Sequence, residues 1–179
     1  MVDGDSALVT QALKGDEAAF EEIVRKYERT IYNVAYRMAR NHDDALDITQ
    51  TVFIKAYRKL ASFNPAYKLF SWLYAIAVNE SINHIKKHSR MVPTDVEVGV
   101  DPRTPADSIE RAEVSEQIQE ALMGLSLDYR IVVVLKYFLE LSYREISGIV
   151  GIPEKTVKSR LFTARERLRV LLVRQGVSR

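Results

Sequence analysis

The sequence predicts an all-α protein made of two small helical domains. Apolar residues recur at three- and four-residue spacing along most of the chain, which is the period of amphipathic helices. The β-branched run 132–134 keeps this helical spacing with its neighbours, so no segment is convincing as a strand. Residues 91–110 interrupt the pattern with three of the five prolines. We therefore expect domains at 1–90 and 111–179, joined by an extended acidic linker at 91–110.

The composition excludes several classes of protein. With 179 residues, 47% of them hydrophobic and 28% charged, the chain has the profile of an ordinary globular protein. It has no cysteine, so disulfide scaffolds, thiolate metal sites and cysteine nucleophiles are excluded, and a reducing, cytoplasmic location is expected. No apolar run approaches the ~18 residues of a membrane span, and the polar start at Met1–Asp5 does not resemble a signal peptide. We expect no direct membrane insertion.

Three long helices are expected in the first domain. An apolar stripe predicts an amphipathic helix over 17–41, with Asp16 as its N-cap. A second helix is expected to start at an Asp43 cap and to end before Pro65, because the residue before a proline disfavours helix. A third helix is expected over 68–88.

Charge is unevenly distributed along the chain, although the net charge is only +2. Lys86, Lys87 and Arg90 form one basic cluster, and a second lies in 153–179. The acidic segment 91–110 separates them. This pattern suggests two contacts with one long polyanion, although two solvated helix ends would look the same.

A helix-turn-helix is predicted near the C-terminal end of the sequence. Ser142 and Glu145 have the spacing of a capping box at the start of a short helix, and Gly151 is placed to end it. Pro153 then begins a second helix after a short turn, which is the spacing of the motif.

The second helix of this motif has one apolar and one polar face. The polar face presents Lys155, Ser159 and Phe162, flanked by Lys158 and Thr163. Such a helix can place lysine and hydroxyl groups on base edges in the major groove, and an exposed phenylalanine on a thymine methyl group. The alternative is an ordinary helical hairpin in which Phe162 packs on a neighbour.

The helix after Pro65 carries a possible single-strand surface. Trp72, Asn79, Asn83 and Lys86 share one of its faces, and aromatic, amide and basic groups together are typical of proteins that bind unpaired bases. The alternative is that Trp72 belongs to the core and the asparagines are merely solvated.

Two further groups of residues are open to more than one interpretation. Asp47, Gln50 and Ile54 lie off the apolar stripe of their helix, as a docking face or only a solvated one. His84 and His88 are one helical turn apart, but no carboxylate accompanies them and both neighbour lysines. We therefore expect no metal site, and no spacing indicates a catalytic site.

Taken in order, the motifs of the chain resemble those of the extracytoplasmic-function (ECF, group IV) sigma factors of bacterial RNA polymerase. The matching strings are Gly15–Phe20, Asp47–Gln50 through Phe53, Phe70–Tyr74, Ile76–Ala77 with Asn79, Tyr129–Arg130, Leu141–Ile146, Thr156–Leu161 and Ala164–Arg165. The resemblance departs from the usual pattern at Thr51, Ala75, Asn83, Ser126 and Lys155, positions that concern specificity more than class.

The resemblance implies that the first domain binds the clamp helices of core polymerase through Asp47, Gln50 and Ile54. It also implies that this domain melts and reads the −10 promoter element, with a flipped base held in the loop 62–71. The implied −10 residues are Phe63, Asn64, Ser71, Trp72, Asn79, Asn83, Lys86 and Lys87. Flipping a base costs a few kcal/mol, which the pocket must offset.

By the same resemblance, the second domain would rest on the polymerase flap and read the −35 element. The implied −35 residues are Lys155, Thr156, Lys158, Ser159, Arg160, Phe162, Thr163 and Arg165. The family also implies promoter-directed transcription initiation, a stress response and control by an anti-sigma factor. It implies neither an enzyme activity nor a cofactor.

Two other classes of protein explain less of the sequence. A conventional helix-turn-helix regulator accounts only for 111–179, and a helical metal-dependent enzyme depends on His84 and His88 alone. Run-off transcription with core polymerase separates the three classes. A sigma factor starts specific transcripts, a regulator needs another sigma factor present, and an enzyme does neither.

The predicted linker should be the part of the chain most accessible to proteases. Its prolines and acids bury little surface, so limited proteolysis should cut between Met91 and Ile109 and release two helical fragments. Mass spectrometry of the products checks this expectation, and cleavage near the termini alone would contradict the two-domain division.

Overall fold

A computed structural model describes residues 4–91 and 109–176, and over these residues the chain is helical with no strand. Contacts divide the chain into two units, Met1–Ala39 with Asp43–Pro93, and Thr94–Arg179 with Arg40–His42. The predicted all-α fold with two helical domains is confirmed. Most of the predicted linker lies outside the described residues.

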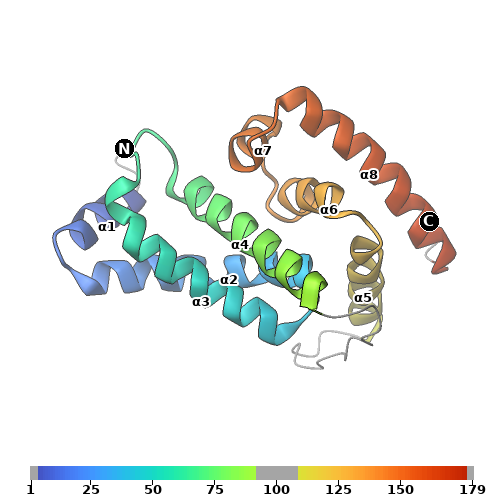
Figure 1. The fold of residues 1–179 in the computed structure, drawn as a ribbon, viewed down its shortest axis with the longest axis horizontal. Helices are drawn as coiled ribbons and strands as arrows, with labels where there is room; N and C mark the ends of the chain where they lie inside the picture. Colours follow the sequence, from blue (N-terminus) through green and yellow to red (C-terminus); the bar gives the residue numbers. More distant parts are fainter. Residues whose placement is uncertain (1–3, 92–108, 177–179) are drawn as a thin grey trace. The chain divides into compact units, whose positions relative to one another are not determined.

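The first unit contains four α-helices, drawn from blue to green in Figure 1. They are α1 (Gly4–Leu13), α2 (Glu17–Ala39), α3 (His42–Lys59) and α4 (Leu69–Met91), and a 3₁₀ turn at Leu60–Ser62 follows α3. Asp16 Oδ1 accepts a hydrogen bond from the Ala19 amide at 3.3 Å, which confirms it as the N-cap of α2. The prediction of Asp43 as a cap is wrong, because α3 begins one residue earlier and Asp43 lies inside its first turn.

Apolar residues from α2, α3 and α4 form the core of the first unit. Its most deeply buried large side chains are Ile23, Ile31, Val34, Met38, Ile48, Val52 and Leu73. Two polar contacts fix neighbouring helices. Buried Asp5 of α1 accepts hydrogen bonds from the Lys26 ammonium and the Tyr27 hydroxyl of α2, and Lys55 of α3 pairs with Glu80 of α4 at 2.7 Å.

The second unit contains α5 (Ile109–Met123), α6 (Leu127–Val133), α7 (Tyr143–Val150) and α8 (Glu154–Arg174). A π-helical turn, Val134–Phe138, continues α6. The β-branched run 132–134 is fully buried within this continuous helical segment. Burial there overrides the weak helix propensity of valine, because packing of an apolar face supplies most helical stability in proteins.

A buried arginine closes the corner between α5 and α6. Arg130 is 7% exposed, and its guanidinium donates to the carbonyl oxygens of Leu122, Met123 and Leu125 at 3.0 to 3.1 Å. Burial lowers the pKa of Arg130, but its ordinary value is so high that the group stays charged. The last carbonyls of a helix have no partner within the helix, so Arg130 acts as a C-terminal cap for α5.

Helix α8 packs along this corner at three levels. Arg160 pairs with Asp128 at 3.1 Å, and the Arg167 guanidinium lies 4.8 Å from the centre of the Tyr129 ring. Further along, a Cβ at Gly124 would come within 2.9 Å of Leu171. The lack of a side chain at Gly124 therefore permits the close approach of α8. Together, the three contacts at the corner between α5 and α6 fix the position of α8.

Replacing Arg130 with methionine should destabilise the second unit selectively. The substitution removes the Arg130 donors from the Met123 and Leu125 carbonyls, whereas the Leu122 carbonyl keeps the Leu125 amide, and we expect a loss of about 3 kcal/mol in the free energy of unfolding. Hydrogen exchange of α5 and α6 amides, followed by mass spectrometry in the full chain, measures this loss.

The matched control is Arg169→Met, because that side chain is 70% exposed and makes only a surface pair with Glu166. Its effect should stay below about 0.5 kcal/mol. Equal exchange rates in the two variants would contradict the capping role of Arg130.

Candidate protein- and DNA-binding surfaces

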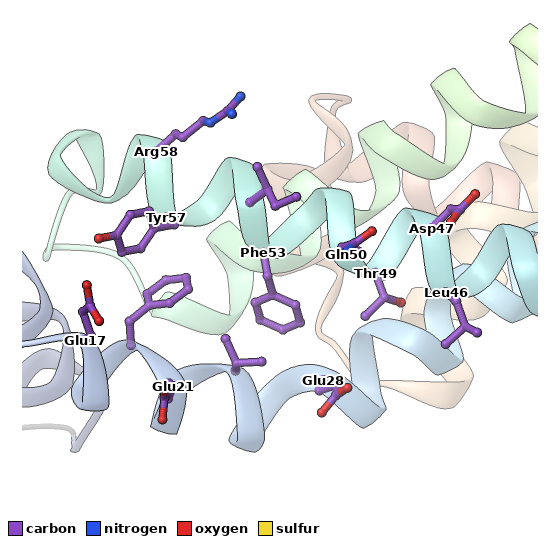
Figure 2. A pocket seen from close by; sticks show the side chains of 13 residues that line it. Glu17, Glu21, Glu28, Leu46, Asp47, Thr49, Gln50, Phe53, Tyr57 and Arg58 are labelled. Atoms are coloured by element: carbon purple, nitrogen blue, oxygen red, sulfur yellow. The ribbon is translucent and has the colours of Figure 1, made fainter.

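An open groove of about 830 Å³ lies between α2 and α3 in the first unit (Figure 2). In the figure, Leu46, Phe53 and Tyr57 point from α3 toward α2, whereas Arg58 points to the opposite side of α3. The complete lining is Glu17, Phe20, Glu21, Val24, Glu28, Leu46, Asp47, Thr49, Gln50, Phe53, Ile54, Tyr57 and Arg58. The groove therefore has an apolar interior and a charged rim.

Large apolar side chains are exposed along this groove. Leu46, Ile54 and Tyr57 are 48%, 44% and 54% exposed, and the centroids of the Tyr57 ring and the Phe20 ring of α2 lie 5.0 Å apart in a T-shaped pair. An exposed apolar patch bordered by polar groups is typical of a protein-interaction site. The border is mainly acidic, because it carries three glutamates of α2 and Asp47 but only one basic side chain, Arg58.

The predicted docking residues Asp47, Gln50 and Ile54 are all exposed and all line the groove. Sequence reasoning missed Leu46 and Tyr57 of α3, and Phe20 and Val24 of α2, as part of the groove. The sequence does contain a second apolar stripe on this helix. Leu46, Phe53, Ile54 and Tyr57 recur at helical spacing beside the buried stripe of α3. That second stripe could have identified the groove.

The predicted single-strand face of α4 begins with an aromatic pair. Trp72 is half-buried, and its ring lies 5.5 Å from the Phe63 ring at an angle of 56°. Phe63 is itself buried, so its prediction as a DNA contact is corrected. Its ring supports Trp72 from within the fold. Asn79 and Asn83 are exposed on the same helix, followed by exposed Lys86 and Lys87.

The loop before α4 presents one aromatic ring that sequence reasoning missed. Asn64 makes a tight turn, in which its side-chain oxygen accepts from the Ala66 amide at 2.9 Å and its carbonyl from the Tyr67 amide at 3.0 Å. Tyr67 is 70% exposed beyond this turn, whereas Ser71 is half-buried in the first turn of α4. The exposed ring can stack on an unpaired base.

Local hydrogen bonds fix the predicted helix-turn-helix of α7 and α8. The Glu145 amide donates to Ser142 Oγ at 3.2 Å and the Ser142 amide to Glu145 Oε2 at 2.9 Å, which confirms the capping box. Gly151 ends α7 with φ of 72°, a conformation that favours glycine. The Pro153 carbonyl then accepts from the Thr156 amide at 2.8 Å in the first turn of α8.

Most predicted base-reading residues lie exposed on α8. Lys155, Ser159 and Arg165 are exposed, and Phe162 is 62% exposed, so the alternative in which Phe162 packs on a neighbour is wrong. Thr156 and Thr163 are half-buried at the border of this surface.

Two predicted DNA contacts on α8 also have partners within the protein. Arg160 is half-buried and paired with Asp128, so it holds α8 on α6 rather than lying open to DNA. Lys158 is exposed, but its ammonium lies 5.6 Å from the centre of the Tyr143 ring of α7, a weak cation–π contact that a phosphate or base can replace.

The structure corrects one premise about the histidines of α4. Asp44 Oδ1 of α3 lies 2.8 Å from His84 Nε2, so a carboxylate does accompany the pair. The sequence did not show it, because the two positions are 40 residues apart in the chain. Across 4–91 and 109–176, no helix combines the length and the apolar character needed to cross a membrane.

Both units match known protein families. The family model of Sigma-70 region 2 matches residues 23–91, and that of Sigma-70 region 4 matches residues 115–168. The chain is 40% identical over 173 residues to the ECF RNA polymerase sigma factor SigW of Bacillus subtilis, covering 90% of this chain and 92% of SigW. It is 33% identical over 175 residues to the RNA polymerase sigma-H factor of Pseudomonas aeruginosa, covering 90% of each chain.

Solved structures agree with this assignment. The sigma factor RpoE of Bartonella quintana, solved in complex with the anti-sigma factor NepR, is 27% identical with a TM-score of 0.71, and the match covers 89% of this chain and 98% of RpoE. CnrH, solved with the cytosolic domain of CnrY, shares the fold with a TM-score of 0.75 at 24% identity, over 98% of this chain and 100% of CnrH. Two matched regions in order and relatives covered along nearly their whole length leave one conclusion: the chain belongs to the ECF RNA polymerase sigma factors and is a transcription initiation factor, not an enzyme.

Proposed function

We propose that this sigma factor binds the clamp helices of core RNA polymerase through the groove between α2 and α3. The observation that supports this assignment is the exposed apolar stripe of Leu46, Ile54 and Tyr57, which the described fold leaves open. An amphipathic helix can lay its apolar face in such a groove. The acidic border favours a partner helix with basic side chains beside its apolar ones.

We also propose that an anti-sigma factor regulates the chain by covering the same groove. RpoE of Bartonella quintana was solved with its anti-sigma factor, which supports this mode of control. A protein that occupies the groove excludes polymerase, and its release on stress would start transcription. Both partners act on the chain in the cytoplasm, where the polymerase works.

For the promoter, we propose that residues 1–90 melt and read the −10 element. The support is a continuous set of groups suited to unpaired bases, with Tyr67 exposed in the loop, Trp72 half-exposed on α4, and Asn79 and Asn83 further along it. Lys86 beyond them is placed to contact phosphates. The segment 91–110 would serve as the linker to the second domain.

Residues 111–179 would rest on the polymerase flap and read the −35 element in duplex form. The capping box and Gly151 set the angle between α7 and α8, and α8 then presents Lys155, Ser159 and Phe162 to the major groove. Arg160 contributes indirectly by holding α8 on α6.

Replacing Leu46 and Ile54 together with serine should weaken binding to core polymerase at least about tenfold, because central apolar residues dominate binding energy. The matched control is Leu13→Ser on α1, since Leu13 is 52% exposed and Leu46 48%, and Leu13 does not line the groove. Binding of labelled chain to core polymerase measures the effect, and circular dichroism confirms equal helicity.

Run-off transcription with core polymerase extends this comparison. The control variant should start specific transcripts as the unchanged chain does, whereas the groove variant should require a higher concentration. Equal polymerase affinity in the groove and control variants would remove the groove assignment without affecting the family.

On the −35 element, Phe162→Ala and Lys158→Ala should have different effects. Phe162 carries no charge, so its loss should alter base preference, at a thymine first, and leave the salt dependence of binding unchanged. Lys158→Ala should cost about 1–3 kcal/mol at one base if it reads an edge, or weaken all sequences and reduce the salt slope by about one if it holds a phosphate.

The measurement is binding of holoenzyme to a −35 library at two salt concentrations. Glu154→Ala is a control from the same helix that removes a side chain of opposite charge. Unchanged sequence preference in both the Phe162 and the Lys158 variants would show that this face of α8 does not read DNA.

A further inference from the structure

Asp44, His84 and His88 converge in the first unit, beside Lys86 and Lys87 near the end of α4. Asp44 lies in the first turn of α3, and the histidines lie in the last two turns of α4. His84 Nε2 is 2.8 Å from Asp44 Oδ1, and the two imidazole rings stack at 4.4 Å with an angle of 19°. One ligand atom from each residue can be chosen so that all three lie within 4.8 Å of one another.

This donor set matches the coordination chemistry of a transition-metal ion. Two imidazoles and one carboxylate bind Zn²⁺ at about 2.0–2.2 Å, and three protein ligands leave one position for water. Mg²⁺ and Ca²⁺ prefer oxygen ligands alone, so the two imidazoles disfavour them. We propose that Asp44, His84 and His88 form a Zn²⁺-binding site that links α3 to α4.

The surroundings permit an ion to enter and be held. The side chains of His84 and Asp44 are 21% and 25% exposed, whereas His88 is exposed and open to solvent. Lys86 follows His84 by two residues, which places it about 200° around the helix. Lys87 lies nearer, but its side chain is exposed and its ammonium can remain in water.

A bound ion would act as a clip between two helices that are distant in sequence. Asp44 and His84 are 40 residues apart, so the unfolded chain would have to close a long loop to bring them together. An ion that binds only the folded state stabilises that state. The clip would hold the end of α4 that carries Lys86 and Lys87, and would add positive charge beside them.

The test is a titration of the full chain, freed of any purification tag, with ZnCl₂ in competition with a chromophoric chelator. We expect one Zn²⁺ per chain and a higher thermal midpoint for the first unit when the ion is bound. His88→Gln should lower Zn²⁺ affinity roughly tenfold or more, since even the loss of a group behind a ligand costs that much. Because His88 is exposed, this variant should fold normally.

His42→Gln is the matched control. The chain has three histidines, and His42 is the one outside the cluster, so its replacement should leave Zn²⁺ affinity unchanged. Asp44→Asn should weaken binding as His88→Gln does. With Co²⁺ as a second probe, the visible absorption of the bound ion should be intense in the unchanged chain, as expected for tetrahedral coordination, and weak in the His88 variant.

Two outcomes would overturn the site. One is the absence of Zn²⁺ binding by the unchanged chain at neutral pH. The other is equal affinity in the His88→Gln and His42→Gln variants. These measurements use neither polymerase nor DNA, so their failure leaves the proposed promoter and polymerase contacts intact, and failure of those contacts leaves the metal site intact.

Discussion

The second unit depends on one buried cation, the guanidinium of Arg130. Arg130 supplies donors to three carbonyls at the end of α5 and so makes a tight corner with α6 possible inside an apolar core. Its neighbours Asp128 and Tyr129 then contact α8 through Arg160 and Arg167. The position of the exposed face of α8 therefore follows from a helix cap, because loss of the corner removes the surface on which α8 packs.

In the first unit the corresponding constraint is that α3 has two apolar stripes and the fold covers only one. Ile48 and Val52 are buried, whereas Leu46 and Tyr57 remain about half exposed beside α2. Leaving such side chains in water forgoes roughly 25 cal/mol for each Å² of apolar surface, which a partner can recover on binding. Burial of the open stripe by a partner would therefore favour binding, whereas its exposure lowers the stability of the free chain.

Local signals made the fold predictable, and long-range neighbours made parts of the sites unpredictable. The capping box at Ser142, the N-cap at Asp16 and the stop at Gly151 each depend on residues within a few positions, and all three were readable in the sequence. Periodicity identified which faces of a helix are apolar but not which neighbour covers them. For that reason Phe63 was assigned to DNA although it packs against Trp72, and Asp44 was not connected with His84.

Although the net charge is small, the chain has two surfaces of opposite charge. One surface suits a protein partner and the other suits DNA. The groove is apolar with mainly acidic side chains on its border, so it would repel a phosphate backbone and favour a protein helix. The open face of α8 carries Lys155, Lys158 and Arg165, which would attract phosphates and release counterions if this face binds DNA as proposed. Salt should therefore weaken the DNA contact much more than contact with the groove, because burial of apolar surface does not depend on counterion release. The groove and the open face of α8 would therefore draw their affinity from different physical sources, burial of apolar surface at the groove and counterion release at α8.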